Sequence, residues 1–196
     1  GTPHAQNYQG AKRLSGTGAC DVQGNDVMVD QNVYVGGSFS GTVDLDPSAG
    51  VSNRTANGTD GFIAKYDHGG NLLWVYSTNT SGNQQVTGLN LGSKLNAAVQ
   101  TSNSSISLIA LETANASLYA STSFSTSSAI KVNKIAKNSQ TVLYLVGSFS
   151  GNFMMSGGIS AVGTDAFLMG FTIGSTPSTY FSFPARTSVV SGPRVD

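Results

Sequence analysis

The stretch VYVGGSFSG (Val33–Gly41) returns later in the chain as LYLVGSFSG (Leu143–Gly151). A second motif, in which Gly-Thr-Asp is followed by a small residue and Phe, comes after each copy, at Gly58–Phe62 and at Gly163–Phe167. A catalytic motif is usually written once, whereas a structural unit is written as often as it is built. The two motifs therefore predict an internal repeat, in which GSFSG forms the turn between two strands.

A weaker third copy fits between the two clear ones. Ser107–Ser123 aligns with Phe62–Thr78, which matches Tyr119 with Trp74. The chain then holds three units of about 45–60 residues, a period typical of propeller or solenoid repeats. In these units we expect glycines to give backbone freedom, rings to fill the core, and aspartates to cap turns through side-chain-to-backbone hydrogen bonds. The repeat positions concerned are Gly37, Phe39, Asp60, Phe62, Trp74, Gly147, Phe149, Asp165 and Phe167.

Composition favours strands over helices. The chain has 24 glycines, a single glutamate and only 10% charged residues, so it lacks the side chains that usually cover helix surfaces. The apolar run VLYLVG (Val142–Gly147) suits a strand that is buried on both faces, as when sheets stack. The strand candidates of the first unit are Asp26–Val29, Asn32–Phe39, Gly61–Asp67 and Leu72–Ser77. Four short antiparallel strands per repeated unit are typical of β-propeller blades.

Asn32–Thr78 resembles the bacterial propeller-type repeat called SBBP. The residues that carry the likeness are Val33-Tyr34-Val35, Gly37-Ser38-Phe39, Asp60-Gly61-Phe62-Ile63-Ala64-Lys65 and Gly70-Asn71-Leu72-Leu73-Trp74. The likeness is fair for Leu143–Phe183 and weak between Ser81 and Ala129. The resemblance implies β-propeller blades in a secreted or cell-surface protein, and it implies no catalytic residues.

The expected fold class is all-β, with about three propeller-type units of four-stranded antiparallel sheets in an incomplete ring. The expected divisions are a strand that closes a preceding blade (1–18), a first blade (19–80), a degenerate second blade (81–123), a third blade (124–184) and the start of a next blade (185–196). So few units do not close a ring alone, and bare sheet edges are a liability. We therefore expect a homo-oligomer or filament, formed by head-to-tail pairing of edge strands.

Charge and residue chemistry argue against several classes of function. A formal net charge of zero disfavours a nucleic-acid partner, and no apolar run approaches the roughly 20 residues of a membrane span. Low charge with abundant Ser, Thr and Asn suits an extracellular or cell-surface protein. His4, His68 and the single Cys20 form no zinc or catalytic pattern. We expect no enzymatic activity and no cofactor.

Two sets of side chains are weaker site candidates. On a strand, Asp44 and Asp46 would point to the same face, and paired carboxylates can bind Ca²⁺; a solvated loop is the other interpretation. Asn-x-Ser/Thr sequons mark glycosylation candidates if the protein is secreted from a glycosylating source. They are Asn53, Asn57, Asn79, Asn103 and Asn115.

The sequence thus predicts a non-enzymatic extracellular structural protein that self-assembles through edge strands into a ring or filament. The alternative function is an adhesin module that presents propeller loops to glycans or to a cell surface. A β-sandwich fibre subunit completed by a donated strand is a further structural alternative, against which the four-strand period argues.

Overall fold

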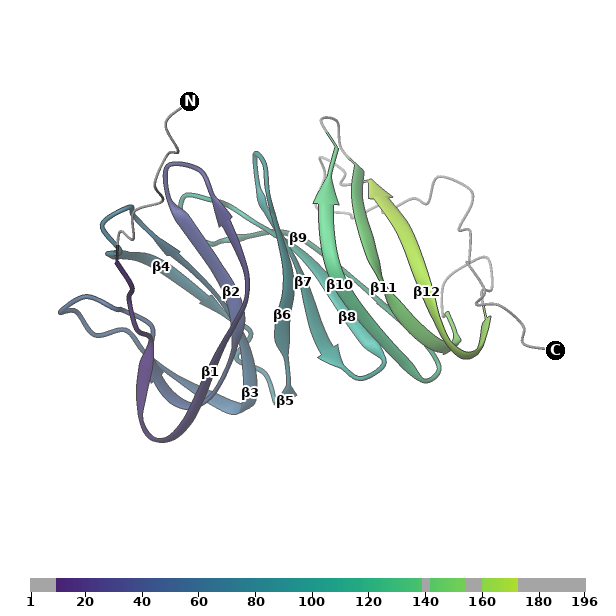
Figure 1. The fold of residues 1–196 in the computed structure, drawn as a ribbon, viewed down its shortest axis with the longest axis horizontal. Helices are drawn as coiled ribbons and strands as arrows, with labels where there is room; N and C mark the ends of the chain where they lie inside the picture. The colour runs from purple at the N-terminus through teal and green to yellow at the C-terminus, as the bar shows by residue number, and fades with distance from the viewer. Residues whose placement is uncertain (1–9, 139–141, 154–159, 173–196) are drawn as a thin grey trace, which may run out of the picture.

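The structure is a computed structural model that describes residues 10–138, 142–153 and 160–172. Within these ranges all regular secondary structure is β-strand, and the sheets are antiparallel apart from one short parallel pair. The all-β prediction is confirmed. The strands form three sheets that lie one beside the next across the molecule (Figure 1). Among the described residues, none of these sheets closes on itself.

Each sheet is a meander of consecutive strands. Sheet 1 contains β1 (Ser15–Val29), β2 (Val33–Asp44), β3 (Asn53–Tyr66) and β4 (Leu72–Ser77), with β5 (Gly82–Asn83) paired parallel to β3. Sheet 2 contains β6 (Gln85–Leu91), β7 (Leu95–Ser102), β8 (Ser105–Leu111) and β9 (Leu118–Ser125). Sheet 3 contains β10 (Ala129–Lys137), β11 (Val142–Asn152) and β12 (Ser160–Thr172). The first strand of sheet 2, β6, contacts β1 on one side and β10 on the other, so the first strands of the three sheets lie together.

Sheet 1 extends further than the sequence predicted. The end of β2 pairs with the start of β1 and with the start of β3, so all three strands continue past the predicted ends. Residues 15–18, which were expected to close a preceding blade, are the first residues of β1. The predicted fourth strand, Leu72–Ser77, agrees with β4. The counterpart that the repeat places at 177–182 lies outside the described residues.

The GSFSG motif is not a turn, contrary to the prediction. It lies inside β2 in one copy and inside β11 in the other. A Cβ atom on Gly37 would lie 2.9 Å from Cε1 of Phe62, and one on Gly147 would lie 2.7 Å from Cζ of Phe167. These glycines therefore let a phenylalanine ring of the neighbouring strand lie against the backbone. Only the last glycine of each motif has a positive φ, 68° at Gly41 and 73° in the second copy.

A β-bulge at a matching place in each first strand relates the three sheets. Asn25, Thr87 and Asn133 are the extra residues, each opposite a continuous pair of residues on the second strand. When the sheets are aligned at this bulge, Gly37 and Gly147 occupy the position of Val99. The structure therefore repeats one local geometry three times.

The middle repeat aligns with the first as predicted along its third strand, but not along its fourth. Relative to the bulge, Ser107 takes the place of Phe62. The loop between β8 and β9, residues 112–117, is one residue longer than the loop 67–71 of sheet 1. Trp74 consequently matches Ala120, and the predicted match with Tyr119 is wrong by one residue.

Most of the hydrophobic core lies between neighbouring sheets. Tyr34 and Ile63 of sheet 1 belong to one cluster with Val86 and Leu89 of sheet 2. The core between sheets 2 and 3 is larger and rich in rings. In it, Phe124 stacks on Phe171 with ring centroids 5.4 Å apart. Each sheet is therefore stabilised mainly by the faces of its neighbours.

Candidate functional site

The face that each sheet turns toward the next one in the chain is here called its forward face. By strand register, three positions define it: two on the second strand of the sheet and one on the third. They are Tyr34, Gly36 and Ile63 in sheet 1, Asn96, Ala98 and Leu108 in sheet 2, and Tyr144, Val146 and Leu168 in sheet 3. The forward faces can therefore be compared position by position.

The forward face of sheet 3 is open, whereas the other two are covered. Tyr34 and Ile63 are 1% and 0% exposed under sheet 2. The matching Tyr144 and Leu168 are 40% and 55% exposed, and Val146, which pairs with Leu168, is 45% exposed. Three apolar side chains thus lie in the open at positions where the same fold elsewhere places a neighbouring sheet.

The face of sheet 1 opposite its forward face is here called its far face, and the side chains at its centre are buried. Phe39, Phe62 and Tyr66 on this face are at most 6% exposed. They form a cluster with Val43 and with the partly buried Leu14, which precedes β1. The extended part of sheet 1 and the segment before it therefore cover the centre of a face that has no neighbouring sheet among the described residues. On the same face, Val27 and Val29 at the β1 edge are 54% and 61% exposed. The two ends of the molecule therefore differ: the centre of the face is buried in sheet 1 and exposed in sheet 3.

Polar side chains fix the spacing between the first strands. The carboxylate of Asp26 in β1 accepts a hydrogen bond from the backbone N–H of Leu89, at 2.7 Å, and forms an ion pair with Lys134 of β10, at 2.9 Å. The bulge residue Asn25 donates to the carbonyl oxygen of Val86, at 2.8 Å. One short segment of β1 thus contacts both other sheets and holds their first strands together.

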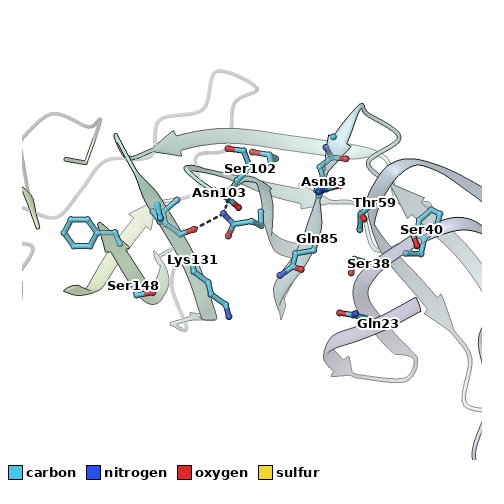
Figure 2. A pocket seen from close by; sticks show the side chains of 18 of the residues that line it. Gln23, Ser38, Ser40, Thr59, Asn83, Gln85, Ser102, Asn103, Lys131 and Ser148 are labelled. Atoms are coloured by element: carbon cyan, nitrogen blue, oxygen red, sulfur yellow. Dashed lines mark hydrogen bonds between the residues drawn. The ribbon is translucent and has the colours of Figure 1, made fainter. Parts of the chain in front are cut away.

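A polar cavity of about 880 Å³ lies where the three sheets meet, near the start of β6 (Figure 2). Its lining comes from all three sheets and includes the turn between β7 and β8. Gln23 lies on one side, Lys131 lies on the other, and Gln85 lies between them. Serine, threonine, asparagine and glutamine dominate the lining, with one lysine and one aspartate, Asp21. The cavity can therefore form many uncharged hydrogen bonds.

The two predicted aspartates of the repeat occupy matching positions inside strands. Asp60 pairs with Phe39, and Asp165 pairs with Phe149. Asp60 is fully buried and accepts hydrogen bonds from the hydroxyl of Thr78, at 2.9 Å, and from two backbone N–H groups, those of Asn57 and Thr80. These bonds tie the end of sheet 1 to the segment that leads into sheet 2.

Trp74 is half-buried between sheets rather than displayed on the surface. Its ring meets Tyr34 edge-on with centroids 5.9 Å apart, and its Nε1 donates to the carbonyl oxygen of Thr113, at 3.1 Å. The same oxygen accepts a hydrogen bond from Lys65 Nζ, at 2.8 Å. These contacts anchor β3 and β4 of sheet 1 to the loop between β8 and β9 of sheet 2.

Asp44 and Asp46 organise the loop between β2 and β3. Asp44 Oδ1 accepts the N–H groups of Ser52 and Asp46, at 2.8 and 3.0 Å, and these bonds hold its pKa below the usual 3.8. Burial, and then the charges of Asp46 and Asp44, raise the pKa of the Tyr66 hydroxyl, which donates to the carbonyl oxygen of Leu45. In the described part of the chain, no group of three or more His, Cys, Asp or Glu side chains is placed to hold a metal ion.

The remaining candidates lie on the surface or outside the described ranges. All five sequon asparagines are exposed, and Asn103 also lines the cavity. His68 is exposed in the turn after β3, Cys20 is half-buried in β1, and His4 lies outside the described residues. The structure does not bring these residues together into one site. Sequence reasoning missed the cavity and the open face, because both depend on how sheets are placed against one another.

Comparisons with known proteins add no relatives. No protein-family model matches the chain, and no curated protein matches it. The likeness to the SBBP repeat therefore stays a prediction. Across the described ranges, the structure has no helix with the length and apolar character needed to cross a bilayer.

Proposed function

We propose that this chain is a non-enzymatic, extracellular structural protein, built from propeller-type sheets, which associates with itself by stacking sheet on sheet. The observation that carries the proposal is the open forward face of sheet 3. Tyr144, Val146 and Leu168 are exposed at positions whose counterparts in sheets 1 and 2 are buried by the next sheet. The fold itself thus indicates the kind of surface that covers such a face, namely another sheet.

The far face of sheet 1 and the forward face of sheet 3 differ in exposure, and this difference bears on how two copies would associate. A ring or filament built head to tail needs an open face at both ends. The centre of the far face of sheet 1 is already buried by its own extension, and Val27 and Val29 at its β1 edge are exposed. We therefore expect two copies to join through their sheet 3 faces in a two-fold dimer. Pairing of edge strands is a second route, since within the described residues β12 pairs only with β11.

The geometry of the face also limits how closely the partner stacks. A Cβ atom on Gly36 would lie 2.7 Å from Cγ1 of Val86, so sheets 1 and 2 approach each other at a glycine. The matching residue of sheet 3 is Val146. A sheet that covers sheet 3 must leave room for this side chain, and two valine-bearing faces related by symmetry satisfy the same requirement on both sides.

Sedimentation velocity over a range of concentrations tests the proposal. The unchanged chain is expected to shift from monomer to dimer, whereas Val146→Lys and Leu168→Lys stay monomeric, because each places a charge in an apolar contact. Val51→Lys is the matched control, since Val51 is 74% exposed in the loop after β2, far from this face in sequence. Equal melting temperatures show that the variants fold. An unchanged chain that is monomeric at about 100 μM, where micromolar association would be complete, contradicts the proposal.

A further inference from the structure

We propose that the polar cavity between the three sheets is a binding site for an uncharged oligosaccharide. This inference is independent of self-association, because it rests on different residues. A volume of about 880 Å³ is large enough for a ligand of several sugar rings. One wall of the cavity and the charge of the lining carry the inference.

The wall from sheet 1 is a patch of hydroxyl and carboxamide groups in register. Gln23 pairs with Ser38 across β1 and β2, and Ser40 pairs with Thr59 across β2 and β3. Alternation along a strand places these side chains on the same face as Tyr34 and Gly36. The apolar half of this face is covered by sheet 2, whereas the polar half lines the cavity.

Both repeated motifs supply this wall. In GSFSG the serines alternate with a core phenylalanine, and in Gly-Thr-Asp the threonine precedes the buried aspartate. The matching residues of sheet 3, Ser148, Ser150 and Thr164, also line the cavity. The hydroxyl residues of the repeat are therefore gathered around one space, and packing of the core does not explain why they are polar.

The charges and hydrogen-bonding groups of the cavity lining indicate the kind of ligand. The lining holds one cation, Lys131, and one anion, Asp21, so it does not select a charged molecule. Sugar hydroxyls can both donate to and accept from the serine, threonine and carboxamide groups of the lining.

Binding is expected to depend on hydrogen bonds rather than on ring stacking. The two phenylalanines of the lining, Phe39 and Phe149, are 2% and 1% exposed, so their rings are not available to a sugar. Each hydrogen bond exchanged with water contributes little net free energy, and the dissociation constant is therefore expected in the micromolar to millimolar range.

The test is titration of the full chain with a panel of neutral oligosaccharides (glucans, mannans and chitin fragments), followed by NMR chemical shifts. At least one saccharide is expected to give saturable shifts of residues in the cavity lining. Gln23→Ala and Thr59→Val, which remove polar groups from the wall, are expected to weaken that binding about tenfold or more. Gln31→Ala, at an exposed turn outside the lining, is the matched control and keeps the affinity.

A sulfated oligosaccharide and inorganic phosphate serve as charge controls. Binding of these anions alone would overturn the proposal, because it would make Lys131 the determinant. A panel in which no neutral saccharide gives saturable shifts overturns it as well. Saturable binding that both wall variants leave unchanged, while they melt at the temperature of the unchanged chain, places the ligand elsewhere and has the same consequence.

Discussion

At the scale of single residues, the repeat preserves a contact between a glycine and a ring. The ring of Phe62 lies against the backbone at Gly37, and Phe167 does the same at Gly147. Turn composition alone could not reveal this, because glycine and serine are also the usual turn residues. The contact becomes visible only when the neighbouring strand is in place. A Cβ atom would lie even closer to a carbonyl oxygen of the preceding strand, that of Gln23 or Lys131, and the two contacts together explain why glycine recurs in both copies.

Replacing Gly37 by alanine is therefore expected to destabilise the fold. The added Cβ atom meets the Phe62 ring and the carbonyl oxygen of Gln23, and such overpacking costs about 1–3 kcal/mol of unfolding free energy. Gly24 pairs directly with Gly37, yet a Cβ atom there has its nearest heavy atom at 4.0 Å. Gly24→Ala is thus the matched control and should stay within about 0.5 kcal/mol of the unchanged chain. Urea denaturation measures both, and equal losses in the two variants would falsify this account.

At the scale of elements, sequence reasoning found the strands and their repeat but not their ends. The alternation of turn and apolar residues located β4, and it located the first half of β2 and the last half of β3. It stopped short of the hairpin around Asp44, because there the strands are polar and are held by pairing with β1. The cavity was missed for a similar reason, since its serines and threonines acquire a common role only after three sheets meet. The alternating serines of GSFSG were the available signal.

The same hairpin should respond to acid. Backbone N–H groups hold the pKa of Asp44 below 3.8, so its charged form stabilises the folded chain above that value. This contribution is lost as the pH falls through the lowered pKa. The difference in unfolding free energy between the unchanged chain and Asp44→Asn should be present at neutral pH and vanish in strong acid. Urea denaturation at a series of pH values measures it, and a difference that is constant with pH contradicts the assignment.

At the scale of the whole molecule, the arrangement of sheets leaves the two ends unlike. Asp26 joins the first strands of all three sheets through Leu89 and Lys134, and stacking continues from one sheet to the next. At one end the extension of sheet 1 covers the centre of the last face and leaves Val27 and Val29 at its edge exposed. At the other, an apolar face of the same design is open. The sequence predicted that the run Val142–Gly147 is buried on both faces, and this prediction is wrong, because Tyr144 and Val146 are exposed. Exposure depends on whether another sheet packs against sheet 3, and the run itself does not show this.

Association through this face should be insensitive to salt. Tyr144, Val146 and Leu168 carry no charge, and apolar burial is not screened by ions. Raising sodium chloride from low to molar concentration should leave the dimer dissociation constant unchanged within about threefold. An interface based on ion pairs would weaken markedly over the same range. Sedimentation equilibrium at several salt concentrations distinguishes the two, and a steep loss of dimer would assign association to charged residues elsewhere.

The meander order of the strands has a consequence for how the chain is made. Every strand of a sheet, apart from the short parallel β5, pairs with the one just before or after it along the chain, so each sheet is complete in sequence before the next begins. During synthesis, sheet 1 can therefore form while later residues are still being added, and each finished sheet offers the following one a surface to fold against. Growth by duplication of such a unit would need no change to the sheets already built.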